Sequence, residues 1–256
     1  MFAFEERRGA TALAFTDRHG GTSRGAYASL NLAGAGGDDP ALTARNRALA
    51  VAALTGGPAP LATMHQVHGA DVHVVDTVPS VSSVPPVPPV PAGPGVADQP
   101  RADALVTRLP GVVLMVRTAD CVPLVLADVE RGVVAVAHAG RPGMVAGVVP
   151  RVLSAMRDQG ARAVHAWVGP HVCGRCYEVP ATMRDDVAAV VPESAATTSW
   201  GTPAVDIGAG VAAQLRYEGV ETVTLDRCTI EDEDLFSYRR QGPESGRLAG
   251  MVWRAP

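Results

Sequence analysis

Residues 111–160 read GVVLMVRTADCVPLVLADVERGVVAVAHAGRPGMVAGVVPRVLSAMRDQG, and they carry the clearest folding signals in the chain. Three runs rich in β-branched residues, at 111–116, 122–127 and 133–138, predict largely buried strands. Glu130, Arg131 and Gly132 join the last two runs, which indicates that these strands are neighbours. Apolar residues then recur at helical spacing up to Gly160, so we predict an amphipathic helix over residues 143–158.

The segments on either side extend this pattern. Asp38, Asp39 and Pro40 predict the start of a helix that runs to Leu54, and residues 61–75 predict a strand, a turn and a strand. Further strands are expected at 163–168 and 220–225, and further helices at 180–191 and 206–217. Because strands and helices mix throughout without an internal repeat, we expect an α/β or α+β layered domain with one sheet system.

One segment differs in composition from the rest. Residues 79–97 read PSVSSVPPVPPVPAGPGVA, a tract without periodicity that favours extended polyproline conformation. We interpret it as an insertion loop. A role as a proline-rich ligand for a partner protein is the alternative.

Composition excludes several classes of protein. The chain has 256 residues, 47% of them hydrophobic, so it can bury a sizeable core and is not a disordered protein. A net charge of −4 without a basic stripe argues against a nucleic-acid partner, and no apolar run is long enough to cross a membrane. Charged residues at positions 5–8 do not suit a signal peptide, so we expect a cytoplasmic protein. No sequence feature specifies an oligomeric state.

Two histidines and one cysteine stand at the ends of predicted strands. His138 ends the apolar run 133–138, and Cys121 precedes the run 122–127. His68 precedes a glycine at a predicted turn. Binding sites commonly assemble on loops at strand ends, and three such ligands would leave one position of a zinc ion open for catalysis. Since the three residues lie on distant segments, spacing alone makes this a hypothesis.

Ten short motifs support it. In chain order they are DRHGGTS (17–23), SLNL (29–32), NR (46–47), QVHG (66–69), ADALVT (102–107), TADC (118–121), HAG (138–140), GPHVCGRCYEV (169–179), FSYRR (236–240) and SGR (245–247). In this order the motifs resemble the laccase-domain family, also called the polyphenol-oxidase or peptidoglycan-editing-factor family. The resemblance extends from about residue 15 to residue 253.

The resemblance implies a fold, a metal site and an activity. It implies an α/β/α sandwich with mixed sheets, and we expect a single domain over residues 1–256. It implies that His68, Cys121 and His138 bind a metal, usually zinc, with copper as another option. Members of the family resemble purine nucleoside phosphorylases that act on adenosine, inosine, guanosine and methylthioadenosine, some with adenosine deaminase activity. Nucleoside and phosphate are therefore the expected small-molecule partners.

Individual residues keep more than one reading. Cys121 is interpreted as a zinc-bound thiolate, a nucleophile activated by histidine, or a small buried side chain. Asp120 is interpreted as a catalytic residue that moves a proton or orients a ligand, or as a structural acceptor. Among the arginines, Arg47 and Arg239 are the preferred phosphate-binding candidates, because guanidinium matches oxyanions bidentately.

Two features qualify this assignment. The family commonly reads HAGWRG where this chain reads HAGRPG at 138–143, which puts a substrate contact from that tryptophan or arginine in question. Cys173 and Cys176 form a CxxC pair that could be redox-active or half of a zinc site. We interpret the pair as part of a loop near the site, and Cys228 as a core residue.

The leading hypothesis is a metal-dependent phosphorylase that cleaves the N-glycosidic bond of purine nucleosides with phosphate. The open metal position could also activate water for deamination. The alternative is a cysteine-dependent, amidase-like editor of peptidoglycan precursors with Cys121 as nucleophile. Copper oxidation is less favoured, since seven histidines are few for a trinuclear copper cluster.

Overall fold

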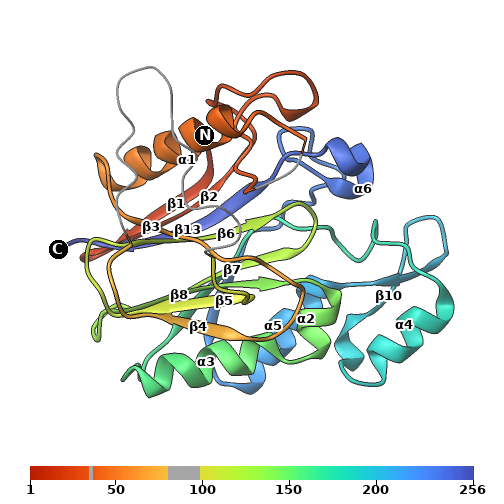
Figure 1. Ribbon diagram of the computed structural model, residues 1–256. Helices are drawn as coiled ribbons and strands as arrows, with labels where there is room; N and C mark the ends of the chain where they lie inside the picture. Colours follow the sequence, from red (N-terminus) through yellow and green to blue (C-terminus); the bar gives the residue numbers. More distant parts are fainter. Residues whose placement is uncertain (35–36, 80–98) are drawn as a thin grey trace.

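Two mixed β-sheets pack face to face at the centre of the protein, and helices cover their outer faces (Figure 1). The computed structural model describes residues 1–34, 37–79 and 99–256. Apart from residue 79, the proline-rich tract at 79–97 lies outside the described residues. The layered α/β fold with mixed sheets is therefore confirmed.

The elements have the following order and bounds. The first sheet runs β1 (Phe2–Arg8), β2 (Thr11–Thr16), β13 (Leu248–Arg254), β6 (Val113–Thr118), β3 (Leu61–Ala62). The second runs β12 (Glu221–Thr224), β9 (His165–Val168), β7 (Val122–Asp128), β8 (Val133–Ala139), β5 (Ala104–Thr107), β4 (Val72–Val75). A separate pair is β10 (Ala195–Thr197) with β11 (Pro203–Val205). The helices are α1 (Pro40–Thr55), α2 (Arg141–Val145), α3 (Val148–Asp158), α4 (Ala181–Ala188), α5 (Ile207–Tyr217) and α6 (Tyr238–Gln241).

Alternating side chains of β7 and β8 pack in two different hydrophobic cores, one on each face of the sheet. Leu124 of β7 points to the outer face, where it packs with α2, α3 and α5. Val125 points inward, into the core between the two sheets, with Phe15 and the fully buried Trp167. Both faces of these strands are therefore apolar, which is why they read as continuous hydrophobic runs. A third core lies between α1 and the outer face of the first sheet.

The chain passes from the first sheet to the second at two neighbouring places. β3 leads through residues 63–71 to β4, and β6 leads through residues 119–121 to β7. These crossovers lie at the same end because β3 and β6 are parallel neighbours. Gln66 holds them together: its Nε2 donates to the carbonyl oxygen of Arg117 at 2.7 Å and its Oε1 accepts from that residue's N–H at 3.0 Å. His68 and Cys121 lie in these crossovers.

The predicted hairpin between the second and third strand runs is confirmed. β7 and β8 are antiparallel, with Val122 opposite Ala139. The predicted helix start is also confirmed, since the Asp39 side chain caps α1 by accepting from the N–H of Ala41. The single helix predicted over 143–158 is instead two helices, because Gly147 takes a positive φ of 80° between α2 and α3.

The prediction of one sheet system was wrong, because the described strands divide between two large sheets and the separate pair of β10 and β11. The first sheet depends on β1, β2 and β13, which residue patterns did not reveal. Within the described residues, no helix combines the length and hydrophobicity needed to cross a membrane.

Candidate metal centre

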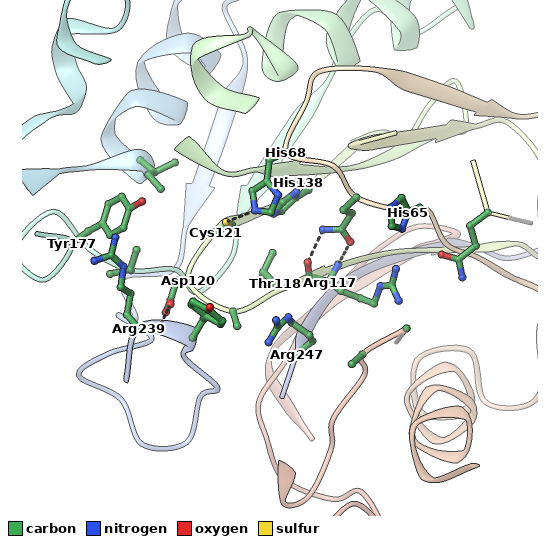
Figure 2. A pocket seen from close by; sticks show the side chains of 18 residues that line it. His65, His68, Arg117, Thr118, Asp120, Cys121, His138, Tyr177, Arg239 and Arg247 are labelled. Carbon is green, nitrogen blue, oxygen red and sulfur yellow. Dashed lines mark hydrogen bonds between the residues drawn. The ribbon is translucent and has the colours of Figure 1, made fainter. Parts of the chain in front are cut away.

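The three predicted metal ligands meet at the crossovers. The candidate ligand atoms of His68, Cys121 and His138 all lie within 4.8 Å of one another. His68 Nε2 is 3.8 Å from Cys121 Sγ, and the two imidazole rings meet edge to face with centroids 4.7 Å apart. Figure 2 shows both rings turned toward the sulfur at the wall of a cavity. His68 is exposed, Cys121 half-buried and His138 buried.

A buried carboxylate positions both histidines. Asp103, fully buried, accepts from His138 Nδ1 at 2.8 Å, which leaves Nε2 of that ring available toward Cys121. Its two oxygens also accept from the N–H groups of Val67, His68 and Gly69 at 3.2, 3.0 and 2.7 Å. His68 has a positive φ of 60°, a strained conformation that these three hydrogen bonds hold in place.

Ionisation equilibria in this cluster favour a thiolate. Burial alone would raise the pKa of Cys121, but hydrogen bonds and charge from His138 and His68 lower it to about 6. Burial alone would lower the pKa of His138, but the hydrogen bonds to Asp103 and Cys121 raise it to about 9. Burial also opposes ionisation of Asp103, yet the His138 hydrogen bond and backbone N–H groups hold its pKa below the usual value. The thiolate is the form that binds metal or acts as a nucleophile.

Two glycines make room for the cluster. Gly140 directly follows β8, and a Cβ there would lie 2.8 Å from His68 Cδ2 and 3.1 Å from Cys121 Sγ. A Cβ at Gly143 would lie 2.7 Å from the carbonyl oxygen of Gly69. In the HAGRPG segment, the glycines therefore keep the ligands together, while Arg141 and Pro142 begin α2.

Asp120 lies beside the cluster with both carboxylate oxygens engaged. Oδ1 accepts from Thr229 Oγ1 at 2.7 Å, and Oδ2 accepts from the N–H of Arg239 at 2.7 Å. The Asp120 carbonyl oxygen accepts from the N–H of Val172 at 2.9 Å, and its φ is +88°. This environment suits a positioning role, in which Asp120 ties three loops to the crossover that carries Cys121.

The cavity has a volume of about 550 Å³, within the usual range for small-molecule sites. Its walls include the metal cluster, Tyr177 and Arg239 on one side, and Arg117 and Arg247 on the other (Figure 2). The guanidinium of Arg239 stacks over the Tyr177 ring at 4.5 Å.

The side chains of Arg47, Arg117 and Arg247 lie close together beside the cavity. Burial, then the charges of Arg47 and Arg247, lower the pKa of Arg117 to about 10. Among residues 1–34, 37–79 and 99–256, no carboxylate forms a salt bridge with any of the three. Their hydrogen bonds go mainly to carbonyl oxygens, such as that of Met64 at 2.7 Å from Arg117 Nη2. Guanidinium groups beside a cavity that form no salt bridge among the described residues favour an anionic ligand.

The structure places the two preferred arginines differently. Arg239 lines the cavity, whereas Arg47 lies behind it on α1 and donates to the carbonyl oxygen of Ala33, a cavity residue. Residue reasoning did not assign Asp103, Arg117 or Arg247. All three lie in or next to the quoted motifs ADALVT, TADC and SGR, which was the available signal.

The donor set fits a zinc ion. One thiolate and two imidazoles are ligands that zinc takes, and three protein ligands leave an open position. The Asp103–His138 hydrogen bond supplies the carboxylate–histidine pairing that orients metal-binding imidazoles. Copper accepts the same ligand types, so the donor set does not distinguish the two metals.

Fold and site together define a layered α/β protein with a candidate metal centre of two histidines and one cysteine. The family described as multi-copper polyphenol oxidoreductase laccase matches residues 12–255, and this chain belongs to that family. A purine nucleoside phosphorylase of Streptomyces coelicolor is 52% identical over 242 residues, which cover 93% of each chain. Another, of Streptomyces griseus, is 50% identical over 250 residues, covering 96% of this chain and 95% of its own.

A solved structure agrees in fold. The Neisseria meningitidis protein NMB0706 has 30% sequence identity and a TM-score of 0.80, and the match covers 100% of this chain and 99% of that one. The family resemblance drawn from the ten motifs is thus confirmed.

Proposed function

We propose that this chain is a metal-dependent purine nucleoside phosphorylase that binds zinc at His68, Cys121 and His138. The observation that carries the proposal is one cavity that joins this cluster to arginines without carboxylate partners among the described residues. The names of the relatives in the two Streptomyces species support the same reaction class.

The arginine side of the cavity suits phosphate. Arg117 and Arg247 line it, and Arg47 adds a third positive charge behind them. A phosphate dianion there would offset positive charges that otherwise repel one another. Of the two arginines predicted from sequence, Arg47 would act on phosphate through its charge.

The opposite side of the cavity suits a purine. Tyr177, with Arg239 stacked on its ring, offers a flat surface on which a base can lie. The ribose would then lie between base and phosphate, near His68, Cys121 and His138. Asp120 would maintain this geometry, since it holds Arg239 and the loop that precedes Tyr177.

In the proposed reaction, a phosphate oxygen bonds to the anomeric carbon of ribose as the bond to the purine nitrogen breaks. The electron pair of that bond leaves with the base, which takes up the proton that the hydrogen phosphate loses. The arginines orient the phosphate and offset its negative charge beside the nucleoside. A zinc ion held by the cluster would supply a Lewis acid in the same cavity. The relatives' names give no support to the adenosine deamination implied by the resemblance, so we do not include it in the proposal.

The first experiment measures zinc and copper content together with phosphate-dependent release of hypoxanthine from inosine, in the wild type and in Cys121→Ala. We expect base release and zinc at this cluster in the wild type, and in the variant loss of base release together with the one zinc ion that the cluster holds. Chelator treatment should abolish turnover, and added zinc should restore it. Base release that is independent of phosphate would contradict the phosphorylase assignment.

One observation favours a second candidate, the cysteine-dependent amidase. Asp103, His138 and Cys121 form a carboxylate–histidine–thiol series, and the lowered pKa of Cys121 suits a nucleophile. The same chelator experiment separates the two, because an amidase of this kind would keep its activity after metal removal while remaining inactive in Cys121→Ala.

A further inference from the structure

A second cluster of possible metal ligands lies outside the cavity. The ligand atoms of Cys173, Cys176, Cys228 and Glu231 all lie within 4.8 Å of one another. We propose that these four side chains bind a second zinc ion, as a closed structural site that stabilises the wall of the cavity.

Two loops distant in sequence supply the ligands. Residues 171–177 and 227–232 run side by side, with the N–H of His171 donating to the carbonyl oxygen of Arg227 at 3.2 Å and the N–H of Thr229 donating to that of His171 at 3.0 Å. Each loop supplies two ligands separated by two residues, as C-x2-C in one and C-x2-E in the other. Paired ligands at this spacing on two adjoining loops are the arrangement of structural zinc sites.

The local turns direct the side chains toward a common point. The N–H groups of Cys176 and Tyr177 both donate to the carbonyl oxygen of Cys173 at 3.0 Å, which closes the turn of the C-x2-C pair. Cys228 Sγ accepts from the N–H of Cys173 at 3.5 Å, and Cys176 Sγ lies 3.3 Å from a carboxylate oxygen of Glu231. These contacts link the four ligands across the loop boundary.

The chemistry of the set selects a thiophilic divalent cation. Three sulfurs and one carboxylate oxygen complete a tetrahedron without an open position, as in structural zinc sites. With Zn–S bonds of about 2.3 Å, neighbouring ligand atoms of a tetrahedron lie about 3.8 Å apart, so the observed separations need little adjustment. Three thiolates and a carboxylate in this small volume would repel strongly, and a divalent cation would offset that repulsion.

The second cluster lies beside residues that contact Asp120 and line the cavity. Thr229 holds Asp120 through its hydroxyl group, and Val172, between His171 and Cys173, holds the carbonyl oxygen of the same aspartate. Tyr177 follows Cys176 directly and lines the cavity. A zinc ion joining the two loops would therefore fix both Tyr177 and the hydrogen bonds of Asp120.

Metal counting tests the proposal independently of enzymatic activity. Cys121→Ala removes a ligand of the first centre, Cys228→Ser removes one of the second, and the double variant lacks one of each. After growth with zinc and exhaustive dialysis, we expect about two zinc ions per chain in the wild type, about one in each single variant and none in the double variant. Cys121→Ala without zinc, or Cys228→Ser with the wild-type content, would overturn the proposal.

Cobalt binding provides a second test, which does not depend on whether Cys228→Ser folds. Cobalt added to metal-free Cys121→Ala should give a thiolate-to-cobalt absorption band, because only the second cluster then offers thiolates to the ion. Glu231→Ala should weaken cobalt binding about tenfold or more, while Glu233→Ala, an exposed carboxylate on the same loop, should leave it unchanged. Absence of the band, or two fewer free thiols than the sequence allows in the unreduced, denatured wild type, would refute a thiolate metal site.

Discussion

Replacement of Asp103 by asparagine should lower both the zinc affinity and the free energy of unfolding of the protein. The carboxylate of Asp103 receives four N–H donors, two on each oxygen: His68 and His138 on Oδ1, Val67 and Gly69 on Oδ2. An asparagine presents one oxygen and one amide NH₂ group. In either orientation, two buried donors then face a donor instead of an acceptor.

The structure sets the expected magnitude. Each buried donor left without a partner costs about 1–3 kcal/mol, so two of them lower the free energy of unfolding of the metal-free protein by about 2–6 kcal/mol. The same change loosens His68 and removes the carboxylate that orients His138. Comparable losses of a carboxylate behind a metal-binding histidine weaken metal affinity about 10–100-fold. Urea unfolding and zinc competition with a chromophoric chelator measure the two effects.

Asp128→Asn is the matched control. Asp128 is also buried, and its oxygens accept from the N–H groups of Arg131, Arg162 and Ala163. It ends β7 roughly 20 Å from Cys121, at about 3.3 Å per residue. In its better orientation the asparagine leaves only the N–H of Arg131 facing a donor, so we expect a loss of stability of about 1–3 kcal/mol with wild-type zinc affinity. Wild-type affinity in Asp103→Asn, or an equal loss of affinity in both variants, would refute the reasoning.

The remaining predictions concern packing at Gly140, the charge of Arg117, the pH dependence of stability at Asp128 and the proline-rich tract. Gly140→Ala should weaken zinc binding about tenfold or more, measured by the same competition, because its Cβ would press on His68. In steady-state kinetics, Arg117→Met should raise the KM for phosphate roughly 10–150-fold, the equivalent of about 1.5–3 kcal/mol. An unchanged KM would show that phosphate does not bind at Arg117. Burial opposes ionisation of Asp128, but backbone N–H groups hold its pKa below the usual value. Its stabilisation is therefore complete above about pH 4 and is lost at lower pH, so the stability difference from Asp128→Asn should shrink between pH 7 and pH 3 in urea unfolding. Deletion of residues 79–97 should leave nucleoside turnover intact; lost turnover in a folded variant would assign the tract a direct role.

Local patterns predicted the centre of the fold well. The strand runs that became β7 and β8 are apolar on both faces, and the turn between them sets their register. Cys121 directly precedes β7 and Gly140 directly follows β8, so the hairpin brings Cys121 near Gly140 and His138. Helix α1 was equally predictable, since Asp39 and Pro40 mark its start and Gly56 its end.

The first sheet was not predictable in the same way. β2 pairs with β13, so that Leu13 lies opposite Val252, a partner at the far end of the chain. No local pattern records such a pairing, because the hydrogen bonds that specify it form only after the intervening chain has folded. The short β3 and β5 strands carry too few residues to show a period of two.

By itself, the sequence indicated the candidate metal ligands, the turns beside them and the strands that adjoin them, because these depend on side-chain type and on neighbours a few residues away. Only the tertiary structure decided which groups act together. Asp103 joins His138 because β5 pairs with β8, and Arg117 joins the cavity because two crossovers lie side by side. Cys228 and Glu231 reach the C-x2-C pair for the same physical reason: long-range pairing of backbone groups sets distances that spacing along the chain does not encode.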